Sequence, residues 1–323
     1  MAVFKRNLFF VTRRAYHAKL RLRDNPPLER TAAAVCFFCG RASRVRRRGR
    51  STAFRWPRAV GIKMPEPKEL AAWNNAVWCD AVCRAHGRPG TFREAVWVTQ
   101  QPAPPYFPNA ITLRGSEARA IHAAAVQELI AARLPGEWAI KDSFCTLELH
   151  WLGFSVLFEA EWVYRPASRP RPDDRINGVH WIRITEAKEL AAWEAAWGAG
   201  QEPFEGWPRL FPDMLLTNGD IAVIAGVRKG EIVAGAVGNR TGAVVGLSNL
   251  FLPREESRDF WAGCLGQVID IFPGLPIVGY DRGEILADAR ETGFEVVGHL
   301  RVWNGPNAAH REKAANQSVG AGC

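Results

Sequence analysis

The chain has 323 residues, a formal net charge of +9, and 47% hydrophobic residues including 13 Trp. This length allows two domains of about 100 to 150 residues, each with enough apolar surface for its own core. No stretch reaches the roughly 18 uninterrupted apolar residues of a membrane-spanning helix. We therefore expect a cytoplasmic protein with no membrane partner.

The positive charge is concentrated at the N-terminus. Residues 1–63 contain 17 Lys and Arg against 2 Asp and Glu, and the arginine run at 44–50 would repel itself within a fold. The segment could be an arm that binds nucleic-acid phosphates, an organelle-targeting peptide, or an extension upstream of a start at Met64. We favour the third interpretation and expect residues 1–63 to be disordered or spurious. Nucleic acid is expected as a partner only through this segment.

The cysteines permit a zinc site but do not favour one. Cys36, Cys39, Cys79 and Cys83, with His86 nearby, offer enough ligands. Cys79 and Cys83 lie four residues apart in a helical pattern, however, where a free cysteine usually packs as a small hydrophobe. We therefore predict no metal and no structural disulfides, as is usual in a reduced compartment.

The chain also resembles itself at a nearly constant spacing. The paired segments are Leu113–Arg119 with Leu252–Arg258, Pro135-Gly136 with Pro273-Gly274, and Gly153-Phe154 with Gly293-Phe294. A period near 139 residues indicates duplicated domains, because solenoid units are shorter. A further pair, KELAAW at 68–73 and at 188–193, is only 120 residues apart, which indicates that the first copy has been shortened.

The first copy, residues 64–165, is predicted from its periodicity and turn residues. The expected elements are a helix at 68–86, strands at 94–99 and 109–113, a helix at 116–134, a strand at 137–141, a short helix before Gly153 and a strand at 154–164. Residues 166–178, rich in Pro, Arg and Asp, are predicted to form a linker.

The second copy, residues 179–303, is more complete. Its expected elements are a strand at 180–185, a helix at 187–197, strands at 221–225, 231–237 and 243–252, a helix at 255–271, a strand at 276–280, a helix at 284–292 and a strand at 294–303. Residues 304–323 are polar and are expected to form a disordered tail. The fold class is therefore α/β (α+β).

This element order, together with three motifs, resembles the GNAT superfamily of N-acetyltransferases. The motifs are Ile232-Val-Ala-Gly235, Val244-Val-Gly-Leu-Ser-Asn-Leu-Phe-Leu-Pro253 and Leu286-Ala-Asp-Ala-Arg-Glu-Thr-Gly-Phe-Glu-Val-Val-Gly298. The resemblance implies two tandem GNAT-like domains, each a mixed central sheet flanked by helices, with the first copy truncated. It also implies that the second copy is the better candidate for activity and that the first is structural.

The resemblance further implies that acetyl-CoA or another acyl-CoA binds where the fourth and fifth strands splay apart. The strand side of that site would be Leu250, Phe251 and Leu252. Arg254 and Arg258 would lie at the following helix N-terminus, which in this family binds the pyrophosphate. Unlike the family's glycine-containing loop, this segment has three carboxylates, Glu255, Glu256 and Asp259, and no glycine.

Acyl transfer to an amine needs a base, usually an acid for the leaving thiolate, and a donor for the oxyanion. The family's usual tyrosine position is Ala289 here, so the nearest catalytic candidates are Tyr280 and Asp281 at the end of the fifth strand. These two residues could instead simply pack against the next helix and cap it. Ser248 and Asn249 are candidate substrate-binding residues. The leading prediction is an N-acyltransferase acting on a small amine; the alternative is a non-catalytic GNAT-like binding module that has lost CoA chemistry.

Overall fold

The computed structural model describes residues 65–199, 204 and 206–306. The predictions for residues 1–63, including a zinc site that uses Cys36 and Cys39, lie outside these residues. In the described part no cluster of three His, Cys, Asp or Glu side chains could hold a metal ion. None of the helices described there is long and apolar enough to cross a membrane.

The first copy begins with a long helix and continues through short strands. Its elements are α2 (Pro67–Ala85), β1 (Thr91–Phe92), β2 (Val96–Val98), β3 (Ala110–Thr112), η1 (Ser116–Ala118), α3 (Arg119–Ala131), β4 (Ala139–Asp142), η2 (His150–Leu152) and β5 (Ser155–Arg165). A proline in the first turn and a capping box between Glu66 and Glu69 start α2.

The second copy has longer strands. Its elements are β6 (Val179–Ile184), α4 (Ala187–Trp197), η3 (Asp213–Thr217), β7 (Ile221–Arg228), β8 (Glu231–Thr241), β9 (Val244–Phe251), η4 (Arg254–Glu256), α5 (Ser257–Ile271), β10 (Ile277–Asp281), α6 (Gly283–Glu291) and β11 (Glu295–Asn304). A capping box between Glu186 and Glu189 starts α4, which explains why the KEL sequence recurs at the start of α2.

The predicted repeat corresponds to the same succession of elements in both copies. β3, α3, β4, η2 and β5 follow in the order of β9, α5, β10, α6 and β11. Gly153 and Gly293 both follow the helical turn before the last strand and both have left-handed φ values, 81° and 94°. Glycine adopts that conformation without the steric cost that a side chain adds, so both positions retain it.

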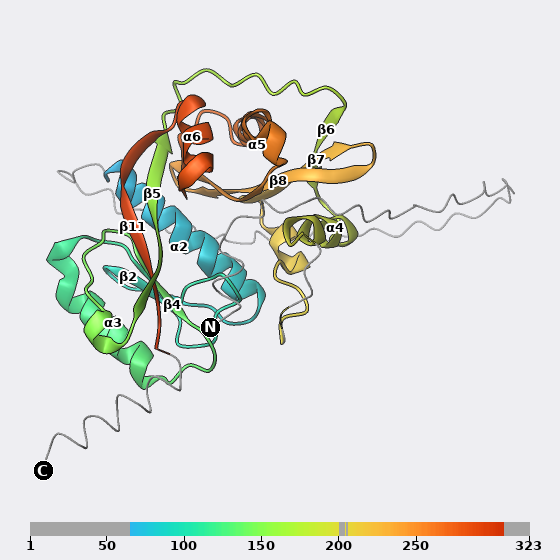
Figure 1. The fold of residues 1–323 in the computed structure, drawn as a ribbon. Coiled ribbons are helices and arrows are strands. Elements are labelled where there is room, and N and C mark those ends of the chain that lie inside the picture. Colours follow the sequence, from blue (N-terminus) through green and yellow to red (C-terminus); the bar gives the residue numbers. More distant parts are fainter. Residues whose placement is uncertain (1–64, 200–203, 205, 307–323) are drawn as a thin grey trace, which may run out of the picture. The chain divides into compact units, whose positions relative to one another are not determined.

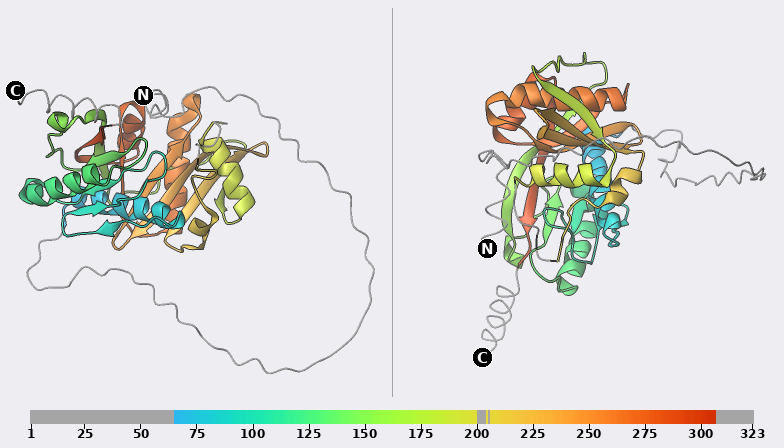
Figure 2. Two further views of the ribbon diagram at one scale, coloured as in Figure 1. Left: turned by 90° about the horizontal axis from the view of Figure 1, so that it is seen from below. Right: turned by 90° about the vertical axis from the view of Figure 1, so that its right-hand side faces the viewer.

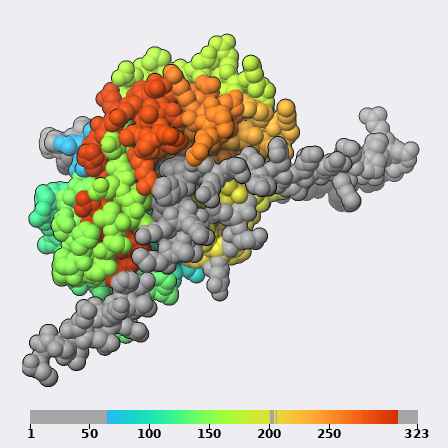
Figure 3. Space-filling model, in the orientation of Figure 1, coloured from blue at the N-terminus to red at the C-terminus, as the bar shows by residue number. Residues whose placement is uncertain are grey.

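The two copies share one sheet, in which each inserts its last strand into the other. The strand order is β1-β2-β3-β4-β11-β5-β10-β9-β8-β7-β6. β11 of the second copy lies antiparallel between β4 and β5 of the first, and β5 lies antiparallel between β11 and β10. Figure 1 shows β5 and β11 running together, and their green and red surfaces interleave in Figure 3. The sequence predicted two separate central sheets and did not predict this exchange.

Helices cover both faces of the strands. Ile224, Val245 and Leu247 pack with α5 and α6 in one cluster, whereas Val223 and Val237 pack with α2 and α4 in another. Val223 and Ile224 are successive residues of one strand, so their side chains point to opposite faces of the sheet. Helices α5 and α6 therefore cover one face and α4 covers the opposite face (Figures 1 and 2). Helix α2 contacts β5, β8, β9, β10 and β11, so it covers the junction between the two copies.

The end of the fold lies slightly beyond its predicted position. β11 includes Asn304, and the Gly305 amide donates to the Trp138 carbonyl at 2.8 Å. The disordered tail was predicted to begin at residue 304, but Asn304 and Gly305 belong to the folded structure. Residues 307–323 lie outside the described part of the chain.

Candidate functional site

The site is built where two parallel strands separate. β9 and β10 pair only at Val245 with Ile277 and at Gly246 with Val278. Beyond these pairs β9 follows β8, whereas residues 279–281 of β10 follow β5. A cavity of about 200 Å³ opens at this splay.

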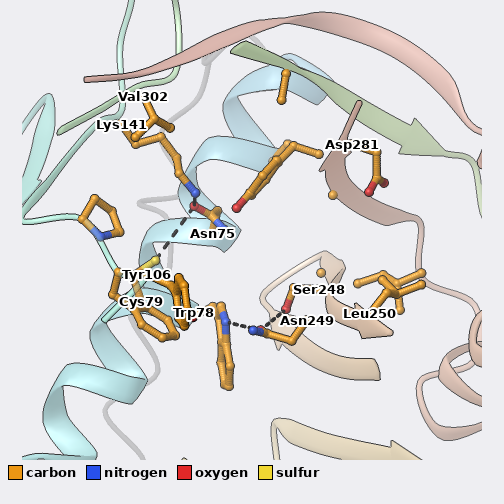
Figure 4. Close-up of a pocket in the computed structure, with 18 of the residues that line it drawn as sticks. Asn75, Trp78, Cys79, Tyr106, Lys141, Ser248, Asn249, Leu250, Asp281 and Val302 are labelled. Atoms are coloured by element: carbon orange, nitrogen blue, oxygen red, sulfur yellow. Dashed lines mark hydrogen bonds between the residues drawn. The ribbon is translucent and has the colours of Figure 1, made fainter. Parts of the chain in front are cut away.

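Both copies line the cavity. Figure 4 shows Lys141 and Asn75 on one side of it and Asp281 on another, with Ser248 and Asn249 on β9 in the lower part of the view. The polar and sulfur-containing side chains around it are Asn74, Asn75, Trp78, Cys79, Tyr106, Lys141, Trp162, Trp197, Asn239, Ser248, Asn249, Tyr280, Asp281 and Arg282. The first copy therefore contributes α2 and Lys141 to the lining of the candidate site.

A β-bulge shapes the β9 side of the cavity. Between the paired positions Val237–Ser248 and Gly235–Phe251, two residues of β9 face one residue of β8. Asn249 lies in this bulge with a left-handed φ of 51°. Its Oδ1 accepts hydrogen bonds from Trp78 Nε1 at 3.0 Å and from Ser248 Oγ at 3.2 Å. A bulge of this kind redirects side chains and frees backbone groups from the ladder, so Ser248, Asn249 and Leu250 all line the cavity.

The bulge requires a left-handed backbone conformation at position 249, and substitutions there can test this. Asn249→Gly and Asn249→Ala both lose the bond from Trp78, but only Ala pays the steric cost of the left-handed conformation, about 1 kcal/mol. We expect the Ala variant to be less stable than the Gly variant by about that amount in urea unfolding. Equal stabilities of the two variants would show that the bulge does not require this conformation.

Tyr280 and Asp281 lie at the end of β10 and both line the cavity. The Tyr280 ring packs edge-on against Trp162, with centroids 5.5 Å apart. In the described part of the chain its hydroxyl has no hydrogen-bond partner. The Asp281 residue is only 6% exposed, and no described group donates to or pairs with its carboxylate. It does not cap α6, whose N-cap is Arg282.

The environment of Asp281 favours the protonated carboxyl. Burial raises its pKa well above the usual value, and the neighbouring carboxylate of Asp288 raises it further. Asp142 lies 139 residues before Asp281 and therefore corresponds to it in the repeat. Its carboxylate accepts backbone bonds from Leu147 at 2.8 Å and from Phe144 at 3.3 Å. The carboxyl group of the first copy is therefore occupied, whereas that of the second is available to a ligand.

Five residues were predicted to bind the cofactor: Leu250, Phe251 and Leu252 on the strand, and Arg254 and Arg258 at the following helix. The three strand residues line the cavity or pack in the core. Leu250 lines the cavity. Phe251 is buried against Trp193, with ring centroids 5.5 Å apart, and Leu252 packs against the core beneath α5. Arg254 is exposed at the start of η4.

The remaining predicted cofactor residue, Arg258, is engaged elsewhere. Its Nη1 lies 2.8 Å from Glu291 Oε2, and it lines a second cavity of about 530 Å³ together with Asp259. Of the three loop carboxylates, Glu256 forms a two-bond pair with Arg228 at 2.6 and 2.9 Å. The structure therefore leaves Glu255 and Asp259 as the acidic groups near the α5 N-terminus that lack an ion pair among the described residues.

The sequence did not predict that Lys141, Asn75 and Cys79 line this cavity, and Cys79 was considered only as a possible zinc ligand. Lys141 is 4% exposed, and its Nζ donates to Asn75 Oδ1 at 2.7 Å. A lone lysine in the apolar run 138–141, one residue before the repeated aspartate, was the available signal. Burial raises the pKa of Cys79 to about 11, so this thiol is neutral near pH 7 and is a poor nucleophile.

Comparison with known proteins identifies the fold. No protein-family model matches the sequence, and no curated protein matches it. Among solved structures, a GCN5-related N-acetyltransferase from Kribbella flavida is similar with a TM-score of 0.51 and 13% identity, over 75% of this chain and 98% of that one. A GCN5-related N-acetyltransferase from Sphaerobacter thermophilus (TM-score 0.45, 13% identity, 76% and 96%) and a tandem GNAT protein from the clavulanic acid biosynthesis pathway (0.42, 13%, 58% and 69%) are also similar. The similarity to the Kribbella flavida structure shows that the chain has the fold of the GNAT superfamily.

Proposed function

We propose that this protein is an N-acyltransferase that moves an acyl group from acetyl-CoA, or another acyl-CoA, to a small amine in the cavity between β9 and β10. One observation carries the proposal: an available, buried carboxyl group lies in a cavity where two parallel strands of a GNAT fold separate. A titratable group with a strongly shifted pKa in such a cavity is a candidate for catalysis.

The residues around the cavity fit the thioester end of an acyl-CoA better than its phosphate end. The bulged strand at Asn249 and Leu250 offers backbone groups and apolar surface to the pantetheine and acyl end. The phosphate end would meet the α5 N-terminus, where Arg254 is favourable and Glu255 and Asp259 are unfavourable. We therefore expect weak binding, carried mainly by the thioester end.

The proposed chemistry assigns one task to each group. The thioester supplies the acyl carbon, to which the amine nitrogen bonds as the carbon–sulfur bond breaks. Asp281 takes the proton from the amine in its ionised form, which the raised pKa makes less abundant at a given pH but a stronger base. The Tyr280 hydroxyl is the candidate donor of a proton to the leaving sulfur. Backbone amides at the Asn249 bulge are candidate donors to the oxyanion.

Titration calorimetry with acetyl-CoA on the full chain tests the proposal. We expect measurable heat and a dissociation constant that improves in Glu255→Gln, because this change removes an unpaired charge near two phosphates. At partly solvated distances the gain is about 1 kcal/mol, or several-fold in affinity. Arg258→Ala should weaken binding if this side chain exchanges Glu291 for phosphate. Glu256→Gln is a control for the loop. Glu256 is paired with Arg228, so this substitution breaks an ion pair, whereas Glu255→Gln removes a carboxylate that has no ion-pair partner among the described residues.

The alternative function, a binding module without CoA chemistry, is favoured by the carboxylates at the α5 N-terminus. It predicts no heat with acetyl-CoA at millimolar concentration and no release of free thiol in the presence of amines. That pair of results would reject the acyltransferase proposal and leave the cavity as a binding site for small molecules.

A further inference from the structure

The cavity contains a buried positive charge that the fold does not neutralise. Lys141 extends from β4, and its Nζ lies 4.1 Å from the centroid of the Tyr280 ring and 2.7 Å from Asn75 Oδ1. In the described part of the chain no carboxylate lies within ion-pair distance of this ammonium. An amide oxygen and an aromatic face satisfy two of its three N–H groups.

A buried ammonium with these partners is costly. Taking a charge out of water is compensated only when an opposite charge or a full set of hydrogen bonds replaces the solvent. The few charged and polar groups of a mostly apolar cavity commonly fix the orientation of its ligand. Lys141 is 4% exposed and lines the same cavity as Tyr280 and Asp281.

The acidic groups nearest in the chain are already occupied. Asp142 faces the other side of β4 and accepts backbone bonds from Phe144 and Leu147. Asp80, on α2, pairs with Arg84 and also accepts bonds from the Gly90 amide and Trp97 Nε1. Asp281 lines the same cavity but is not within ion-pair distance of Lys141, so the described residues leave the counter-charge for Lys141 to a ligand.

We propose that the acceptor amine carries a carboxylate, and that Lys141 binds this carboxylate while the amine lies near Tyr280 and Asp281. The acceptor is then a small amino acid or a similar amino carboxylate. The proposal rests on the acyltransferase function proposed above, and it gives the first copy a direct part in substrate recognition. A charge-assisted hydrogen bond to this buried ammonium is stronger than a neutral one, which makes the carboxylate a selective feature.

The test compares amines that differ only in the carboxylate. Glycine, β-alanine and γ-aminobutyrate are paired with methylamine, ethylamine and propylamine, and acetyl transfer by the full chain is followed by thiol release. We expect a higher kcat/KM for at least one amino carboxylate than for its matched alkylamine. Lys141→Met should reduce that ratio by about tenfold or more, chiefly through KM for the amino carboxylate. KM for acetyl-CoA should change far less.

Lys68→Met is the matched control. It removes the same charge from a lysine that also lies over an aromatic ring, Phe144 at 4.9 Å, but that does not line the cavity. The control should leave the ratio unchanged. If Lys141→Met does not fold, the test uses the unaltered protein, for which kcat/KM of each amino carboxylate is compared with that of its matched alkylamine. The proposal is overturned if every alkylamine is preferred over its amino carboxylate.

Direct binding separates this inference from the proposed function. Calorimetry of the amino carboxylates without acetyl-CoA should show binding that Lys141→Met weakens. If this holds while acetyl-CoA neither binds nor reacts, the carboxylate site stands and the acyltransferase proposal fails. If acetyl-CoA binds and alkylamines are acetylated preferentially, the function stands and the role of Lys141 is wrong. A loss of acetyl-CoA affinity in Lys141→Met, with the amine ratio unchanged, would also overturn it.

Discussion

Asp281→Asn is expected to lower kcat/KM for acyl transfer by about 100- to 10,000-fold, the range typical for loss of a positioned general base. The amide has nearly the same shape as the carboxyl group but cannot accept the amine proton. Because Asp281 makes no hydrogen bond or ion pair with the other described residues, the substitution breaks no native interaction. Steady-state rates of thiol release measure the loss, and calorimetry should show that acetyl-CoA binding is retained.

The pH dependence of stability gives a second measure of the same residue. Burial and Asp288 raise the pKa of Asp281 in the folded protein above its value in the unfolded chain. The folded state therefore holds the proton more tightly, and this stabilising contribution, present at low pH, is lost as the pH rises through the folded pKa. Asp281→Asn removes that dependence. The melting temperature of the variant relative to the unaltered protein should therefore increase from acidic to neutral pH.

Asp142→Asn is the matched control at the equivalent position of the first copy. Its carboxylate accepts the backbone bonds of Leu147 and Phe144, so an amide there should lower the melting temperature. If Asp281→Asn instead destabilises the protein at neutral pH while activity is unaffected, Asp281 is a structural residue and not the base.

The sequence was sufficient to predict most elements, because their signals are local. The helix predicted at 187–197 matches α4, and the turn at Lys229-Gly230 has φ values of 52° and 79°, as a tight hairpin turn requires. The strand exchange was not predictable in this way. β5 and β11 are both long strands with neighbours far away in the sequence, and periodicity shows which face of a strand is buried but not which strand lies beside it.

The same reason explains which of the cavity-lining residues the sequence singled out. Ser248, Asn249, Leu250, Tyr280 and Asp281 belong to the two separating strands of one copy and were identified together. Lys141, Asn75 and Trp78 come from the other copy and reach the cavity only because the sheet is continuous across β11 and β5. Asn239 falls between the predicted strands 231–237 and 243–252 but is buried in β8, where its carbonyl accepts a bond from Asn74 at 2.9 Å.

Cutting the chain in its linker should show how completely the two copies depend on each other. A protease site placed after Arg175 lies between β5 and β6, beside a side chain whose ion pair is with the nearby exposed Asp173. If the folded protein is cleaved there, we expect the two fragments to remain together on gel filtration. They should separate only in denaturant, because each fragment supplies a strand that lies between two strands of the other.

Fragments 1–175 and 176–323 produced separately should not fold. Without β11, the first fragment leaves one edge of β4 and both edges of β5 unpaired and exposes Trp162. Without β5, the second fragment leaves β11 with no neighbouring strand and exposes Leu300 and Trp303. All three side chains are fully buried in the intact chain, and exposing such large apolar groups costs several kcal/mol, comparable with the stability of a whole domain. Near-UV circular dichroism should therefore show no fixed aromatic packing for either fragment, and a native spectrum after the two are refolded together in equal amounts. Two independently folded fragments, each with a cooperative melting transition, would show that the copies do not exchange their last strands.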